Sequence, residues 1–214
     1  MTLELHYVPG SFYAWRVQLA LEHKGIAHDL KRVDFAAGGA KTDSYLAMNP
    51  RSKVPALRDG DFTLYESVAM LEYIEDKYPD TTKLYPDDVE TRARVRRMIC
   101  EIDNYWFPHA LVLVSNLYFK SDEADWNEEA VAGASEGIKK ELEYYEGRVR
   151  EDSFFGDITA ADLAIYPMAA HLKRFDMRRP ASELDAAIGP KFRRLMKRIE
   201  SQPYFDKTFP SHWK

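Results

Sequence analysis

The spacing of hydrophobic and polar residues changes several times along the first eighty residues. Residues 3–8 alternate between apolar and polar side chains, which is typical of a strand with one buried face. From Ala14 the apolar positions recur at the three- and four-residue spacing of an amphipathic helix of about three turns. Residues 27–35 alternate again and predict a second strand, which ends at the segment AAGGAK.

The following segment predicts a short helix, a hairpin and a longer helix. Residues 42–49 predict the short helix, and two short strands flank the dipeptide Asp59-Gly60, a strong hairpin signal. Residues 66–79 carry apolar side chains at helical spacing and end at a proline. We therefore expect the order βαβαββα in residues 1–80, with a parallel pair joined by a crossover and an antiparallel hairpin.

The rest of the chain is helical in pattern almost throughout. Residues 81–88 hold threonines, aspartates and a proline, and they predict a linker. The helical runs within 89–214 carry apolar stripes, and the first stripe comprises Val95, Ile99, Ile102 and Trp106. Strands followed by helices predict a fold class of α/β plus all-α, in two domains.

Composition narrows the class of protein. The 214 residues are 45% hydrophobic and 30% charged, as in a globular protein with a sizeable core. A net charge of −5 argues against nucleic acid or an anionic membrane as the partner. No apolar run approaches the roughly 18 residues of a spanning helix, and the N-terminus lacks a signal-peptide pattern. We therefore expect a cytoplasmic protein.

Cys100 is the single cysteine of the chain. One cysteine excludes an internal disulfide and any metal site made of cysteines alone, so we expect no metal. Free cysteine behaves as a small hydrophobic side chain, and we expect Cys100 on the buried side of a helix.

Val54-Pro55 is a first candidate for chemistry, because a proline at the start of a strand has two interpretations. A trans bond is ordinary and has no functional meaning. A cis bond would turn the N–H and C=O groups of Val54 outward, where they can pair with an extended peptide.

Glu66-Ser67 is a second candidate, at the start of the following helix. Ser67 is either a plain N-cap or part of a carboxylate site that uses free N–H groups and the helix dipole. Glu66 suits an ammonium group. A ligand with a peptide backbone, a carboxylate and an ammonium group fits both dipeptides, and the tripeptide γ-glutamyl-cysteinyl-glycine is such a ligand.

The order of these features strongly resembles a known family. The segment NPRSKVPALRDGDFTLYESVAMLEYIEDKYP resembles the glutathione-binding segment of glutathione transferases. VPGSFYAWRVQLALEHKGI (8–26) is similar to the first strand, loop and helix of the theta and zeta classes, and GDITAADLAIYP (156–167) resembles a helix-capping segment of the second domain. The resemblance implies a thioredoxin-like domain (1–80), a linker (81–88), an all-helical domain (89–214) and a homodimer.

The resemblance also assigns roles to individual residues. It implies that Pro55 is cis, that Val54 pairs with the cysteinyl backbone, and that an acid near the dimer interface approaches the partner's ammonium group. The glutathione-binding residues that it implies are Lys41, Lys53, Val54, Pro55, Glu66, Ser67 and Asp103.

The residue that activates the thiol is expected in the loop after the first strand. A free thiol has a pKa of about 8.5 and the thiolate is the nucleophile, so a neighbouring hydrogen-bond donor that lowers the pKa favours reaction. Ser11 matches the zeta-class serine when the chain is aligned on WRV. Tyr13 and Tyr7 are rivals, and main-chain donors alone are a further alternative. The loop holds no cysteine, which disfavours thiol–disulfide reductase activity.

The pocket for the second substrate is expected between the two domains. The candidate wall residues are Phe12, Tyr13, Trp106, Phe107, His109, Leu113 and Tyr118. For each of them, packing in the core of a helical bundle is the alternative interpretation. Pro108 is expected to kink or break the helix that carries most of these residues.

The resemblance implies an enzyme that conjugates the glutathione thiolate to small hydrophobic electrophiles. Dehalogenation, ether cleavage and isomerisation are related activities that stay open. The zeta loop reads Ser-Ser-Cys where this chain has Ser11, Phe12 and Tyr13, which disfavours maleylacetoacetate isomerase. The alternatives are a non-catalytic glutathione-fold binding module and a carrier of hydrophobic ligands.

Overall fold

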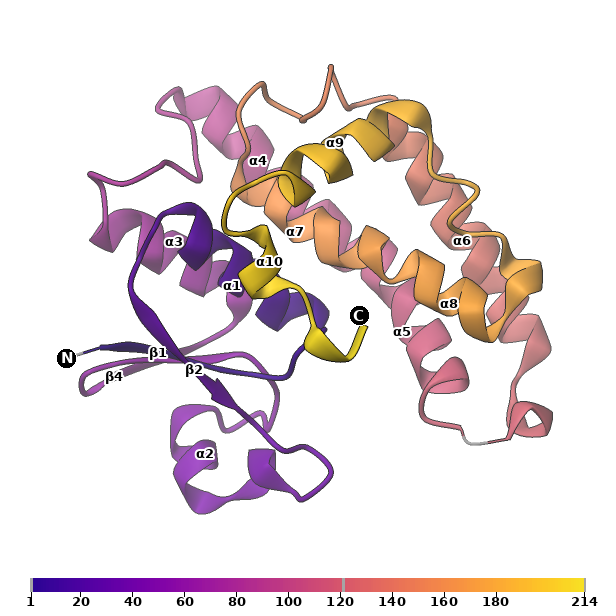
Figure 1. Ribbon diagram of the computed structural model, residues 1–214, viewed down its shortest axis with the longest axis horizontal. Coiled ribbons are helices and arrows are strands. Elements are labelled where there is room, and N and C mark those ends of the chain that lie inside the picture. The colour runs from indigo at the N-terminus through magenta and orange to yellow at the C-terminus, as the bar shows by residue number, and fades with distance from the viewer. Residues whose placement is uncertain (1, 121, 214) are drawn as a thin grey trace. The chain divides into compact units, whose positions relative to one another are not determined.

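The computed structural model describes residues 2–120 and 122–213 (Figure 1). The chain divides into a first unit, Met1–Asp87 with Glu200–Lys214, and a second unit, Asp88–Ile199. The segment after Glu200 was expected in the helical domain, and this expectation is wrong. Phe205 is buried in the first unit, and Phe209 packs against Trp15 of the first helix, so apolar burial places the segment there.

The first unit is a four-stranded mixed sheet with helices. Its elements are β1 (Leu3–Tyr7), α1 (Phe12–His23), β2 (His28–Arg32), α2 (Asp43–Met48), β3 (Ala56–Asp59), β4 (Phe62–Tyr65) and α3 (Ser67–Lys77), joined later by α10 (Phe205–Thr208). The strand order is β2-β1-β3-β4. β1 and β2 are parallel, and the other two pairs are antiparallel. The predicted order βαβαββα is therefore confirmed.

Both faces of this sheet are covered by helices. Figure 1 shows α1 and α3 on one face and α2 on the other. β1 buries Leu3 and Leu5, and α1 is buried on nearly every side because it also packs against α3 and α10. The hairpin closes through the two residues between Asp59 and Phe62, and Gly60 has a φ of +63°, which glycine adopts at low cost.

The second unit is helical. Its elements are α4 (Val89–Glu101), the π-helix η2 (Ile102–Trp106), α5 (Phe107–Leu117), α6 (Glu128–Glu146), α7 (Ala160–Ala170), α8 (Leu172–Arg178) and α9 (Pro190–Glu200), with short 3₁₀ turns at Glu123–Asp125 and Pro180–Ser182. α7 is buried along almost its whole length and packs against α4, so it forms the centre of this unit.

Pro108 changes the helix that carries it in a specific way. The helix does not stop but widens into η2, where the N–H of Phe107 donates to the carbonyl of Ile102, five residues earlier. Pro108 lies at the start of α5 directly after this wider turn, and the change from α-type to π-type hydrogen bonding accommodates its missing N–H. The expected interruption is thus a π-turn.

The apolar stripe predicted for α4 and η2 is confirmed, since Val95, Ile99, Ile102 and Trp106 are all buried. The prediction for Cys100 is wrong, because its side chain is exposed. Successive helical residues are about 100° apart, so the residue directly after buried Ile99 points away from the stripe.

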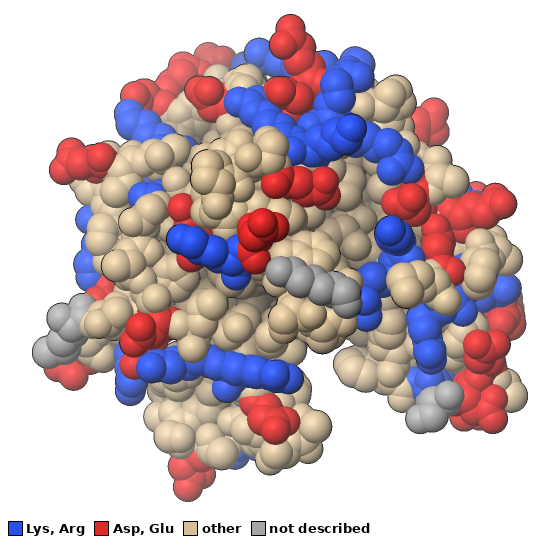
Figure 2. Space-filling model, in the orientation of Figure 1, with Lys and Arg blue, Asp and Glu red and all other residues tan. Residues whose placement is uncertain are grey.

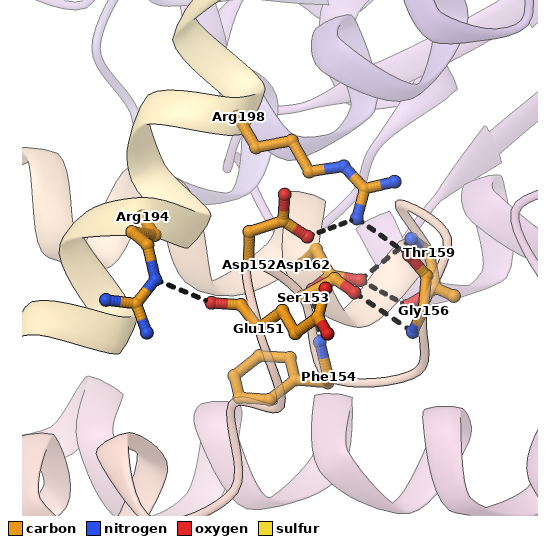
Figure 3. Close-up of polar contacts among 9 residues, drawn as sticks. All are labelled: Glu151, Asp152, Ser153, Phe154, Gly156, Thr159, Asp162, Arg194 and Arg198. Atoms are coloured by element: carbon orange, nitrogen blue, oxygen red, sulfur yellow. Dashed lines mark hydrogen bonds and ion pairs between the residues drawn. The ribbon is translucent and has the colours of Figure 1, made fainter.

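The start of α7 carries a capping box, within the segment 156–167 that resembles a helix-capping segment (Figure 3). One carboxylate oxygen of Asp162 accepts hydrogen bonds from the Thr159 N–H at 2.8 Å and the Thr159 hydroxyl at 2.7 Å. The other accepts from the Phe154 N–H at 3.0 Å. Burial raises the pKa of the Asp162 carboxyl, and these donors act against that rise. The box therefore orders the loop before α7 as well as the helix itself.

α9 presents a basic face, over which blue side chains gather in Figure 2. Several of these side chains are committed to neighbouring loops. Arg194 donates to the Glu151 carbonyl at 2.9 Å, and Arg198 binds the Asp152 carboxylate and the Gly156 carbonyl, both at 2.7 Å (Figure 3). This basic face therefore holds α9 against the loop that precedes α7.

Candidate active site

The chain directly before Val54 is fixed by two side chains of the first unit. The Tyr45 hydroxyl and the Asn49 side-chain amide both donate to the Lys53 carbonyl, each at 2.7 Å. The Asn49 amide oxygen also accepts from the Arg51 N–H at 3.0 Å. Burial raises the pKa of Tyr45 to about 12, so its hydroxyl keeps the proton that it donates. These bonds form a clamp on Lys53, which we call the Lys53 clamp.

The same loop is anchored a second time at Ser52. Ser52 has a φ of +55°, in the left-handed region that few residues other than glycine adopt. Its hydroxyl donates to the Ala40 carbonyl at 2.7 Å, which ties the loop to the segment before α2. The conformation of residues 49–53 is therefore set by side-chain hydrogen bonds.

The Val54–Pro55 bond is cis. The side chain of Val54 packs against a small apolar cluster that comprises Val33, Ala40, Tyr45 and Ala56. In the described part of the chain, the N–H and C=O groups of Val54 form no hydrogen bond. A rigid loop thus presents one main-chain donor and one acceptor side by side, as an extended peptide requires.

Glu66 occupies the N-cap position of α3 with a φ of +72°. For a residue other than glycine such a backbone costs about 1–3 kcal/mol, and residues of this kind cluster at ligand sites. The exposed Glu66 carboxylate pairs with no other described residue. Ser67 is buried as the first residue of α3, so the interpretation of Ser67 as a plain N-cap is wrong.

Three half-buried hydroxyl side chains lie in or beside the loop between β1 and α1. Ser11 is the N-cap of α1, and its oxygen accepts the Ala14 N–H at 3.5 Å, which leaves the hydroxyl proton for another acceptor. Tyr13 lies under the Arg16 guanidinium, 4.6 Å from the ring centre, and Tyr7 ends β1. Ser11, Tyr13 and Tyr7 all remain candidates for activating a thiol.

The remaining predicted binding residues lie in both units. Lys53 and Lys41 are exposed, Lys53 beside Val54 and Lys41 in the short 3₁₀ turn before α2. Phe12, the first residue of α1, is buried. Asp103 is half-buried in η2 of the second unit.

Two predicted wall residues are part of the core of the second unit. Trp106 is fully buried, with ring centres 5.8 Å from Tyr145 and 6.1 Å from Phe192, and Leu113 is also fully buried. A fully buried side chain offers no surface to a ligand, so the structure corrects the expectation that these two line a pocket. For Trp106, the apolar stripe from Val95 to Trp106 gave the right prediction, which is burial in the helical core.

His109 also has a packing role. A Cβ atom on Gly137 would lie 2.3 Å from the His109 ring, so the ring fills the space that glycine leaves where α5 meets α6. His109 is half-buried, and the structure gives it a helix–helix contact rather than an acid–base partner.

Two kinds of feature are absent from the described residues. No group of three or more His, Cys, Asp or Glu side chains is arranged to hold a metal ion there. Within the same residues no helix has the length and apolar character needed to cross a membrane.

Comparisons with known proteins agree with this geometry. A family model described as "Glutathione S-transferase, N-terminal domain" matches residues 5–82, which include most of the sheet and the loops described above. Glutathione S-transferase F10 of Arabidopsis thaliana is 30% identical over 175 residues, 78% of this chain and 79% of that protein. The chain belongs to the glutathione S-transferase family.

Two further known proteins match nearly the whole chain. "Probable maleylacetoacetate isomerase 1" of Drosophila melanogaster is 29% identical over 209 residues, 96% of this chain and 80% of that protein. A solved structure of glutathione S-transferase-I bound with the ligand lactoylglutathione has 26% identity and a TM-score of 0.79, and covers 97% of this chain and 98% of its own.

Sequence reasoning missed a buried ion pair that fixes the linker of this family member. The Lys24 ammonium binds the Glu75 carboxylate at 2.6 Å and the Thr82 carbonyl at 2.9 Å. The same carboxylate accepts from the N–H groups of Leu84 at 3.1 Å and Tyr85 at 3.2 Å. The sequence signal was only a charged residue on each of two helices. The Lys53 clamp was missed for the same reason, since Tyr45 and Asn49 have no motif of their own.

Proposed function

We propose that this chain binds glutathione and transfers its thiolate to small hydrophobic electrophiles. The observation that carries the proposal is that the first unit contains two unusual backbone conformations, the cis bond between Val54 and Pro55 and the positive φ of Glu66. Val54 offers an unpaired main-chain donor and acceptor, and Glu66 offers an unpaired acid in a left-handed cap. A γ-glutamyl dipeptide unit complements both of these features.

In this proposal each end of the tripeptide has its own partners. The cysteinyl backbone pairs with Val54. The γ-glutamyl carboxylate binds Ser67 and the free N–H groups at the start of α3, and its ammonium group binds Glu66. Lys53 and Lys41 supply positive charge for the glycyl carboxylate. In the proposed homodimer, Asp103 adds a second acid for the ammonium group.

The reaction requires a thiolate at neutral pH. We assign the hydrogen bond that stabilises this thiolate to Ser11, whose hydroxyl proton is free to donate at the positive end of the α1 dipole. The thiolate attacks the electrophilic carbon, a carbon–sulfur bond forms, and the bond to the leaving group breaks. The thiol proton goes to solvent.

Two measurements on the purified protein test this function. We expect the protein to be retained on immobilised glutathione and to convert a general aryl halide into its glutathione conjugate. Retention without conversion of any electrophile in a panel would support a binding or carrier module instead. Failure to bind glutathione at all would remove the proposal.

Glutathione-dependent isomerisation is a second candidate, because the likeness to a probable maleylacetoacetate isomerase spans 96% of this chain. The loop of Ser11, Phe12 and Tyr13 departs from the zeta-class Ser-Ser-Cys and argues against it. Isomerisation of maleylacetoacetate leaves the glutathione concentration unchanged, whereas conjugation consumes glutathione. An assay that follows both quantities therefore separates the two reactions.

A further inference from the structure

The segment 205–213 packs against α1 through aromatic side chains. The indole N–H of Trp15 donates to the Thr208 hydroxyl at 3.1 Å. The Trp15 ring meets Phe209 at 6.0 Å and Trp213 at 5.3 Å, both edge to face, and Phe209 meets Trp213 at 6.1 Å. Edge-to-face contacts of this kind stabilise a fixed ring orientation. Trp213 is therefore held in place by two other rings.

The Trp213 ring lies directly against the loop that carries Ser11. Gly10, the residue before Ser11, has a φ of +80°, and a Cβ atom there would lie 2.9 Å from Cζ2 of Trp213. Only glycine suits both the left-handed backbone and the close indole. The backbone of the thiol loop and the indole are thus fitted to each other.

Trp213 differs from Trp15 in its exposure. Trp15 is 1% exposed and belongs to the core, whereas Trp213 is only half-buried. Trp213 is thus only half-buried while its large, flat, polarisable ring lies against Gly10, the residue before the proposed thiolate donor. Such a surface favours stacking with another flat ring over contact with a small aliphatic group.

We propose that Trp213 is a specificity-determining residue that favours planar aromatic electrophiles. This inference rests on the proposed transferase function and on the placement of the thiolate beside Ser11. For an aryl halide, the thiolate attacks the ring carbon that bears the halogen, the carbon–sulfur bond forms, and the halide leaves with the electron pair of the broken bond. The half-buried indole holds the ring of the electrophile during this attack.

The test compares an aryl halide with an alkyl halide of similar reactivity. We expect Trp213→Ala to raise the KM for the aryl halide about fivefold, with no change for the alkyl halide or in the affinity for glutathione. Trp213→Phe should restore most of the loss, because it returns a flat ring. Ser211→Ala, at an exposed neighbouring position, is the matched control and should behave as the unchanged protein.

A binding measurement keeps the test independent of turnover. Calorimetric titration with an S-aryl glutathione conjugate and with S-methylglutathione should show a loss of about fivefold in Trp213→Ala for the aryl conjugate alone. Where Trp213→Ala fails to fold, Trp213→Leu keeps apolar volume without the aromatic face and should show the same selective loss.

Two results overturn the inference. Equal losses for aryl and alkyl ligands, or a loss of glutathione affinity, mean that Trp213 only supports the loop of Gly10. No change in any variant means that the ring of the electrophile lies elsewhere. In either case the unchanged protein still binds glutathione and turns over electrophiles, whereas failure of the proposed function abolishes both activities in the unchanged protein.

Discussion

Ser11 carries two hydrogen-bonding roles that use different parts of one hydroxyl group. Its oxygen accepts the Ala14 N–H at 3.5 Å, a long bond that contributes little to the helix, and its proton is available to a thiolate. Tyr13 and Tyr7 are rivals, because a phenol hydroxyl is a stronger hydrogen-bond donor than an alcohol hydroxyl. The sequence placed all three in or beside one loop, and the resemblance favoured Ser11. The sequence alone could not decide between them, because that choice depends on where each hydroxyl points.

Replacing Ser11 separates binding from activation. We expect Ser11→Ala to keep its glutathione affinity, while turnover at neutral pH falls about 10- to 100-fold. The reason is that a rise of one to two units in the thiol pKa lowers the thiolate fraction by the same factor. The rising limb of the kcat/KM profile should move to higher pH. Tyr13→Phe and Tyr7→Phe are the matched controls, and an unshifted profile in Ser11→Ala with a shifted one in either control reassigns the role.

At the scale of elements, the loop between α2 and β3 shows how local structure prepares a binding edge. The Lys53 clamp and the Ser52 anchor hold the loop without help from the sheet ladder. Sequence patterns predicted helix α2 and strand β3, because each has a local signature. The clamp needs two side chains to reach one carbonyl, and no spacing rule encodes that.

Removing one side chain of the Lys53 clamp should weaken glutathione binding without slowing the chemical step. We expect Asn49→Ala to raise the KM for glutathione about fivefold, because it removes a hydrogen bond worth about 1 kcal/mol, while kcat at saturating glutathione stays the same. Steady-state kinetics at several glutathione concentrations measure this split. Asn127→Ala is the control, because it removes a comparable side-chain amide that caps α6 in the second unit. This variant should be less stable, but its KM for glutathione should not change.

The hairpin is attached to α3 by a charge pair with a defined pH dependence. The Lys77 ammonium donates to the Asp59 carboxylate and, with the Tyr73 hydroxyl at 2.8 Å, lowers the pKa of Asp59. A lowered folded pKa gives stability that is present above the unfolded pKa of about 4 and is lost as pH falls through the folded value.

Asp59→Asn should therefore destabilise the protein by about 0.5–1 kcal/mol at pH 7, because the pair is partly exposed, and by progressively less below pH 4. Urea unfolding at pH 7 and at pH 3 measures the difference. A constant loss across this range would show that the amide substitution acts through packing and not through charge.

At the scale of the whole molecule, the link between sequence and structure is strongest where signals are local. The order of strands and helices, the capping box of Thr159 and Asp162, and the stripe from Val95 to Trp106 were all predictable. Cys100 was misplaced by one helical position. Trp106, Leu113 and the segment after Glu200 were misassigned, because side-chain packing and long-range burial decide their places.

The buried ion pair of Lys24 and Glu75 affects the first unit as a whole, since it joins α1, α3 and the chain from Thr82 to Tyr85. We expect Glu75→Gln to lower the free energy of unfolding by about 3–5 kcal/mol, because the fully buried Lys24 charge loses its partner. Glu90→Gln, which breaks an exposed pair with Arg94, should cost no more than about 0.5 kcal/mol in the same urea titration.

We propose that Val54, Glu66 and Ser67 together bind glutathione, and a crystal structure of the protein soaked with glutathione is the decisive measurement. We expect the cysteinyl backbone to pair with the main chain of Val54, the γ-glutamyl ammonium group to bind Glu66, and the thiol to lie within hydrogen-bonding distance of the loop that holds Ser11. Glutathione bound at any other surface, with Val54 and Glu66 uncontacted, would contradict it.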